Sequence, residues 1–201
     1  MSRLPVSTDT LAELPVSTLA SGQRLYRVNE TGYPSPVFYS TSAENRWTPV
    51  AGSPGVCYLA ISKTGAIAES VCRNSAYLEE EEKIVSLNAL STKGMYEIHL
   101  TEPVQVLDLT VSNLGRYRLD ATILSDYDQT RSPPYKFCPA WASHAVSLGL
   151  HGILYRSRHV IDEPCLALFE GSASLQSSLF DDLRHPELLA ILEEQFGWAV
   201  T

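Results

Sequence analysis

The order of the predicted strands and helices most constrains the fold of this chain. Compact apolar runs typical of buried strands occur at Val56–Ile61, Ile153–Tyr155 and Cys165–Phe169. Helical segments are predicted after the first of these runs, around Trp141, and near the C-terminal end of the sequence. Because the elements do not alternate as strand, helix and strand, we expect an α+β fold of twisted β-sheets with peripheral helices, not a doubly wound parallel sheet.

Turn residues and hydrophobic periodicity predict the remaining elements. The irregular stretch 131–139, which contains three prolines, is a candidate pocket loop. Further strands are expected over residues 25–28, 37–39, 96–100 and 104–109, and helices from Ser62 or Thr64 through Arg73, around Trp141 as far as Gly149, and from Pro186 through Phe196. In the first of these helices, Glu69 lies off the apolar stripe marked by Ile67 and Val71.

Chain length indicates a single domain. A chain of 201 residues is long enough to bury a core of its own. The run Leu-Pro-Val-Ser-Thr occurs at Leu4–Thr8 and again at Leu14–Thr18, which is too short to be a structural repeat. We therefore expect an N-terminal arm over residues 1–20, followed by a single domain over residues 21–201.

Composition and charge indicate a protein of the cytoplasm. Hydrophobic residues make up 44% of the chain, yet no apolar run approaches the roughly 18 to 20 residues that cross a bilayer. The start of the sequence lacks the continuous apolar segment of a secretory signal. A net charge of −8 disfavours general binding to nucleic-acid phosphates. We expect neither a membrane nor a nucleic acid as a direct partner.

Cysteine and histidine spacing gives no indication of a metal site. The four cysteines never approach a C-x-x-C spacing, and each lies among apolar neighbours, so we expect four free thiols. The five histidines show no H-E-x-x-H pattern and no pairing at i and i+4, so no metal ion is expected. A serine hydrolase is disfavoured because the G-x-S-x-G motif is absent.

Short patterns far apart in the sequence indicate a nucleotide-handling pocket. The chain lacks the glycine-rich turns of Rossmann folds and P-loop proteins, so side chains must hold any phosphate. The segments Asn45-Arg46-Trp47, Gly55 to Ala60, Ala66 to Glu69 and Gly152 to Arg158 resemble the RES domain family, which is named after an arginine, a glutamate and a serine. The resemblance spans most of the chain, from about Leu25 to Phe169.

The resemblance implies an ADP-ribosyltransferase-like fold that acts on NAD+. It implies Arg27, Glu69 and Ser157 as catalytic residues and Arg46 and Tyr58 as NAD+-binding residues. Glu69 would stabilise the positive charge that develops on the ribose, and Ser157 would hydrogen-bond the ribose or the amide. Arg27 and Arg46 are alternative grips for the diphosphate. The ring of Tyr58 would stack on nicotinamide, a flat cation.

Each of these residues also has an ordinary structural interpretation. Glu69 would form a surface pair with Arg73 at i and i+4, and Arg27 would be an exposed strand residue. Tyr58 would belong to the core, and Ser157 would be a turn residue at the end of a strand. The family pattern favours the functional interpretation of Glu69 and Arg27.

The resemblance further implies the toxin of a toxin–antitoxin pair, which cleaves the nicotinamide–ribose bond of NAD+ as a glycohydrolase or a phosphorylase and so arrests growth. A protein ADP-ribosyltransferase with NAD+ as donor is an alternative. A second alternative is a non-catalytic interaction module, which would bind a partner without consuming NAD+. The implied partner is an Xre-like helix-turn-helix antitoxin. The residues themselves do not choose among water, phosphate and protein as the acceptor.

Overall fold

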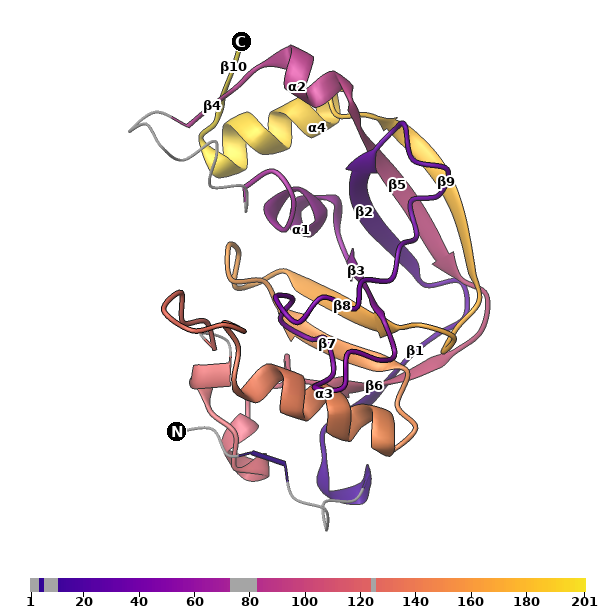
Figure 1. The fold of residues 1–201 in the computed structure, drawn as a ribbon. Coiled ribbons are helices and arrows are strands. Elements are labelled where there is room, and N and C mark those ends of the chain that lie inside the picture. The colour runs from indigo at the N-terminus through magenta and orange to yellow at the C-terminus, as the bar shows by residue number, and fades with distance from the viewer. Residues whose placement is uncertain (1–3, 6–10, 73–82, 124–125) are drawn as a thin grey trace.

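A curved β-sheet forms the frame of the protein (Figure 1). The computed structural model describes residues 4–5, 11–72, 83–123 and 126–201. Its eight strands are β1 (Val16–Leu19), β2 (Arg24–Glu30), β3 (Val56–Ala60), β5 (Lys93–Leu100), β6 (Val104–Asp108), β7 (Gly152–Arg156), β8 (Pro164–Phe169) and β9 (Leu175–Asp182). Their spatial order is β1-β6-β7-β8-β3-β2-β5-β9. Residues 16–19, within the expected N-terminal arm, therefore form one edge of the sheet.

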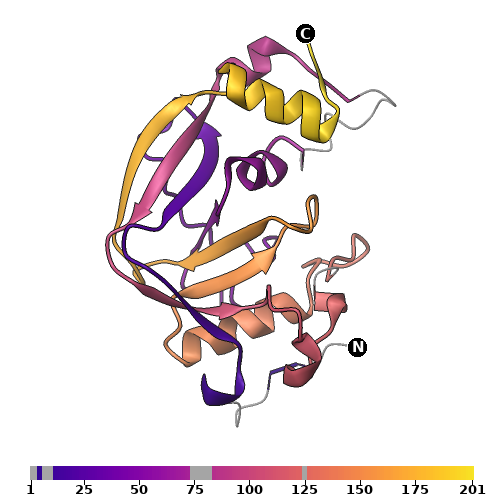
Figure 2. The same cartoon turned by 180° about the vertical axis from the view of Figure 1, so that it is seen from behind.

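Short helices lie around this sheet. They are α1 (Lys63–Ala68), α2 (Leu87–Ser91), α3 (Phe137–Ser147) and α4 (Pro186–Ala190), which continues as a π-helical turn (Ile191–Gln195). The remaining elements of the described residues are 3-10 turns at Leu11–Glu13, Leu114–Tyr117 and Ala121–Ile123, and a small parallel sheet of β4 (Ile84–Val85) and β10 (Ala199–Val200). Seen from opposite sides, α1 and α4 lie inside the curve of β2, β5 and β9 (Figures 1 and 2). Among the described residues, no helix has the length and apolar character needed to span a membrane.

A single residue pair joins the two halves of the sheet. β2 and β3 pair through Tyr26 and Ala60, whereas β2 pairs with β5 along its whole length, from Arg24 to Glu30. We call β2, β5 and β9 the first wing, and β3, β8, β7, β6 and β1 the second wing. Because the ladder between β2 and β3 is so short, the next hydrogen bond between the wings is donated by a side chain and not by a backbone group.

Apolar side chains pack on both faces of the sheet because neighbouring strand residues point to opposite sides. On one face, the strands and helices share a core that includes Trp47 and Trp141. On the other face, Leu25 and Ile98 of the first wing pack in one cluster with Leu166 of the second wing. The sheet therefore folds back on itself, and this second cluster holds the two wings together.

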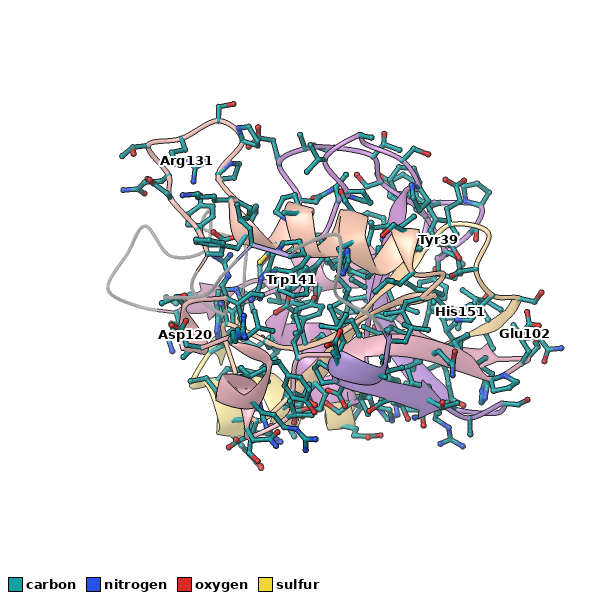
Figure 3. The ribbon with its side chains drawn as sticks, turned by 90° about the horizontal axis from the view of Figure 1, so that it is seen from below. Tyr39, Glu102, Asp120, Arg131, Trp141 and His151 are labelled. Atoms are coloured by element: carbon teal, nitrogen blue, oxygen red, sulfur yellow. The ribbon has the colours of Figure 1, made fainter. Side chains whose placement is uncertain are left out.

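A buried carboxylate fixes the start of α3. Asp126 accepts hydrogen bonds from the backbone N–H groups of Phe137 at 2.6 Å and Cys138 at 2.7 Å, which lack partners inside the helix. The expected irregular stretch 131–139 ends earlier than predicted, because α3 begins at Phe137 and takes up its last proline in the first turn. Figure 3 shows Trp141 on the inner side of α3 and Arg131 at the periphery, on the preceding loop.

One expected strand is not formed. Residues 37–39 pair with no strand, and the nearest pairing is an isolated bridge between Ser40 and Val56. Pro34 and Pro36 lie just before this segment and carry no backbone N–H for a ladder. Conversely, the edge strand β9 was not predicted from the sequence, because most of its side chains are exposed and it lacks an apolar run.

The first predicted helix is shorter than expected. It ends at Ala68 with Glu69 as its C-cap, and the i to i−4 pattern is then lost, because the N–H groups of Ser70 and Cys72 bond the carbonyl of Ile67, three and five residues back. Its expected end, Arg73, lies outside the described residues, and so does the surface pair it would form with Glu69. Glu69 thus lies where the chain leaves the helix.

Close backbone contact between β7 and β8 depends on Gly152. A Cβ atom at this position would lie 2.5 Å from the carbonyl oxygen of Ala167, well inside van der Waals contact. Glycine therefore allows the two strands to approach. This approach sets the position of β7, the strand that leads to Ser157.

We expect the thiols of the native protein to be poorly reactive. The four cysteines are free, and burial raises the pKa of Cys72 to about 11 and that of Cys138 to about 12. Burial also raises the pKa of Cys57 and Cys165. At about pH 8, Ellman's reagent should react at least about 100-fold more slowly with the native than with the unfolded protein, because thiolate is scarce. Rapid labelling of the native protein would contradict this expectation.

Candidate functional site

The side chains of Glu69 and Ser157 meet, although 88 residues separate them in the sequence. Ser157 is 2% exposed, and its Oγ donates a hydrogen bond to Glu69 Oε1 at 2.7 Å. The same Oγ accepts a hydrogen bond from the backbone N–H of His159 at 3.1 Å. Since the backbone occupies a lone pair of the hydroxyl, its proton is directed to the carboxylate. The orientation of Glu69 is therefore fixed by a buried donor.

Glu163 ties the segment of Ser157 to the start of α1. Its carbonyl accepts a hydrogen bond from the backbone N–H of Ser157 at 3.0 Å. Its carboxylate accepts a hydrogen bond from the hydroxyl of Ser62. Ser62 also caps α1, because its Oγ accepts from the N–H of Gly65 at 2.9 Å. One residue thus links the two segments that bring Glu69 and Ser157 together.

Arg27 bridges the two wings beside this pair. It lies on β2, and its Nη1 donates hydrogen bonds to the carbonyl of Tyr58 at 3.0 Å and to Sγ of Cys57 at 3.2 Å, both on β3. Its Nε is buried and has no hydrogen-bond partner among the described residues. The guanidinium is therefore anchored on one side and retains a donor for a ligand.

Tyr58 and Tyr155 form an aromatic wall next to Glu69. Their rings meet edge to face, with 6.5 Å between the centroids and an interplanar angle of 84°. The hydroxyl of Tyr58 accepts a hydrogen bond from the backbone N–H of Trp47 at 2.8 Å. Trp47 in turn packs on Tyr155, with 5.6 Å between the ring centroids. The aromatic wall is therefore held from behind by a buried tryptophan.

These residues surround a pocket of about 230 Å³ between β2, β3 and α1. Arg27, Tyr58, Glu69 and Tyr155 line it, whereas Ser157 lies behind Glu69. A narrower recess of about 10 Å³ shares Tyr58, Glu69 and Tyr155 with this pocket and extends beyond them. Glu69 therefore lines both spaces, and each of them also contains arginine: Arg27 in the pocket, and Arg46 and Arg158 in the recess.

Arg46 lies under the aromatic wall. It is 6% exposed, and its guanidinium carbon is 4.9 Å from the ring centroid of Trp47 and 5.2 Å from that of Tyr155. Its Nη2 donates a hydrogen bond to the carbonyl of Ile123 at 2.8 Å. Arg46 lines the recess beside Glu69, not the larger pocket. Arg46 therefore lies near the other predicted site residues, but one of its guanidinium nitrogens is already hydrogen-bonded to the backbone.

Arg158 is a member of the site that sequence reasoning did not include. Its guanidinium carbon lies 4.9 Å from the ring centroid of Tyr127 and 5.9 Å from that of Tyr135, and it lines the recess together with Glu69. The only indication in the sequence is its position directly after Ser157. Tyr135 lies in the predicted pocket loop 131–139 and also lines the recess.

The charges of the site come from these arginines and Glu69. Burial, followed by the neighbouring Glu69 carboxylate, raises the pKa of Tyr155 well above its ordinary value, so its phenol stays neutral. The described residues contain no group of three or more histidine, cysteine, aspartate or glutamate side chains that could hold a metal ion. A ligand with a negative group for Arg27 and a positive centre for Glu69 fits this arrangement best.

Comparison with known proteins identifies the family. A search of curated proteins finds no match. A chain of the crystal structure of the M. tuberculosis MbcT–MbcA toxin–antitoxin complex is similar, with a TM-score of 0.59, 20% identity, and coverage of 86% of this chain and 92% of that chain. This likeness, together with the twisted sheet and its surrounding helices, confirms the expected α+β fold. Residues 24–187 match the model of the RES domain, and because this match covers most of the chain, the protein belongs to the RES domain family.

Proposed function

We propose that this protein is a toxin that cleaves the bond between nicotinamide and ribose in NAD+. One observation carries the proposal: the Glu69 carboxylate, fixed by the buried hydroxyl of Ser157, lies on the wall of a pocket that Arg27 also lines. Membership of the RES domain family and the likeness to a chain of a toxin–antitoxin complex support it. NAD+ carries a diphosphate for an arginine and a cationic ring for an aromatic wall.

The residues of the site would act on the developing charge. As the ribose–nicotinamide bond breaks, its electron pair leaves with nicotinamide, and positive charge spreads over C1 and the ring oxygen of the ribose. A fixed carboxylate stabilises this charge without having to reorganise. In this scheme Glu69 is the stabilising group, Ser157 holds it in place, and Arg27 grips the diphosphate. Tyr58 offers an aromatic face to the nicotinamide cation.

A small acceptor fits the site better than a protein side chain. The recess beyond Glu69 has a volume of about 10 Å³, which is the room that one water-sized group needs. Reaction of C1 with water would give ADP-ribose, and reaction with phosphate would give ADP-ribose 1''-phosphate. The recess itself favours water as the acceptor, whereas phosphate would have to approach through the larger pocket, so we place hydrolysis ahead of phosphorolysis and of protein ADP-ribosylation.

We further propose an antitoxin as the protein partner, of the Xre-like helix-turn-helix type, and the cytoplasm as the compartment, because the substrate NAD+ is available there. The similar chain comes from a toxin–antitoxin complex. Purification of the protein from its native locus should recover the product of an adjacent gene in a stoichiometric complex. Recovery of the protein without such a partner would count against this part of the proposal.

Replacement of Glu69 tests the proposed reaction. Glu69→Gln should lower nicotinamide release from NAD+ at least about 100-fold, because the neutral amide cannot stabilise the positive ribose. Chromatography of nicotinamide and the ADP-ribose products, with and without phosphate, measures both the rate and the acceptor. The exposed Glu193→Gln serves as the control and should retain full activity. Equal activity of Glu69→Gln and the unaltered protein would refute the assignment.

The link between α1 and Ser157 can be tested with two matched caps. Ser62 caps α1 near the site, and Ser86 caps α2 in the same way, by accepting from the N–H of Ala89 at 3.2 Å. Each serine-to-alanine variant should lose about 1 kcal/mol of unfolding free energy in urea. Only Ser62→Ala should also slow NAD+ cleavage, because it releases Glu163. Equal activities of the two variants would argue against this link.

Arg46 and Arg158 should differ in their effect on stability. Arg46→Ala should cost about 2–4 kcal/mol of unfolding free energy, because it leaves the buried carbonyl of Ile123 with only the weak thiol donor of Cys138 and opens a cavity under Trp47. The exposed Arg158→Ala should cost less than about 1 kcal/mol. Denaturant unfolding measures both. If Arg46→Ala is as stable as the unaltered protein and only its KM for NAD+ rises, Arg46 is a substrate contact instead.

A further inference from the structure

Two large aromatic side chains are exposed close to the candidate site. Tyr33 is 60% exposed and Phe38 is 62% exposed, and both belong to the loop that follows β2. Together with Arg27 and Asn29 of β2, and with Pro34 and Val37 of the same loop, they line a groove of about 430 Å³, which we call the aromatic groove. Its size is within the range of small-molecule sites. Exposed rings that gather on one groove indicate a binding surface.

The loop that carries these rings is restrained. Pro34 and Pro36 fix two backbone angles, and the hydroxyl of Ser35 accepts a hydrogen bond from the N–H of Val37 at 3.1 Å. A restrained loop loses little conformational entropy when a ligand binds, so its exposed rings are prepared for a partner.

The aromatic groove and the candidate pocket are adjacent. Arg27 and Phe38 line both of them. The arginine therefore separates a pocket that contains Glu69 from a groove that contains exposed rings. A dinucleotide has the same order of parts, with a diphosphate between two nucleosides. If Arg27 grips the diphosphate and the nicotinamide ribose lies at Glu69, the second nucleoside extends into the groove.

We propose that the aromatic groove binds the adenine ring of NAD+, which stacks on Phe38 and Tyr33; this inference rests on the proposed function. Base–aromatic stacking is favourable for any flat base. The side chain of Asn29 lies on the same face of β2 as Arg27, two residues away, and also lines the groove. Its amide carries both a donor and an acceptor, which complement the amino group and ring nitrogen at the edge of adenine.

The test compares ligands with and without the adenylate part in four groove variants. Tyr33→Ala and Phe38→Ala remove a ring, whereas Tyr33→Phe and Phe38→Trp keep one. Phe180→Ala, a partly exposed aromatic on β9 outside the groove, is the control. Binding of ADP-ribose is measured by calorimetry, and kcat/KM is measured for NAD+ and for nicotinamide mononucleotide.

Both alanine variants should bind ADP-ribose about 5- to 150-fold more weakly, which is the effect of losing a stacked ring. Their preference for NAD+ over nicotinamide mononucleotide should fall by a similar factor, while Tyr33→Phe, Phe38→Trp and Phe180→Ala behave like the unaltered protein. Unchanged ADP-ribose binding in both alanine variants would overturn the inference. So would an equal loss of activity on both substrates, because that would indicate a general disturbance of the site. Loss of antitoxin binding with unchanged nucleotide binding would assign the groove to the partner protein instead and would also overturn it.

The same experiment separates this inference from the proposed function. If the unaltered protein binds ADP-ribose but releases no nicotinamide, the proposed reaction fails, and the ADP-ribose affinities of the ring variants still decide the role of the groove. If the unaltered protein cleaves NAD+ and the ring variants retain its KM and its ADP-ribose affinity, the reaction stands and the adenine site is wrong.

Discussion

The short ladder between β2 and β3 is the constraint on which the candidate site depends. Beyond the pair of Tyr26 and Ala60, the carbonyl of Tyr58 receives its hydrogen bond from the side chain of Arg27 instead of from the backbone of β2. A complete ladder would satisfy this carbonyl equally well but would close the space between the wings. The arginine therefore has two functions: it completes the hydrogen bonding of β3 and it brings positive charge to the pocket.

The position of Glu69 at the C-terminal end of α1 is locally unfavourable. A carboxylate at the end of a helix faces the partial negative charge of the last carbonyls, and α1 surrounds it with small apolar residues. The hydrogen bond from Ser157 offsets this cost, and the contacts of Glu163 hold the segment of Ser157 against the start of α1. Proteins commonly keep such locally unfavourable residues where function requires them. The arrangement therefore agrees with a role in binding or catalysis more than with a role in stability.

Much of the sheet could be predicted from the sequence, because β3, β7 and β8 are buried on both faces and read as uninterrupted apolar runs. The edge strands β1 and β9 lack that signal. The residues of the site came from the family resemblance: a lone serine such as Ser157 after a strand carries no recognisable pattern. The burial of Arg46 under Trp47 and the stacking of Arg158 on Tyr127 arise from long-range packing, which no local pattern encodes.

Because Gly152 has no side chain, the candidate site should be sensitive to substitution at this position. β7 runs from Gly152 to Arg156 and delivers the next residue, Ser157, to the carboxylate it orients. Any side chain at Gly152 would push β7 away from the Ala167 carbonyl, and the displacement would reach the hydroxyl through a single rigid strand. The geometry of the pocket therefore depends partly on the absence of a Cβ atom at Gly152, a residue that does not line the pocket. A bound substrate or inhibitor would not contact this position and could not compensate for a displaced strand.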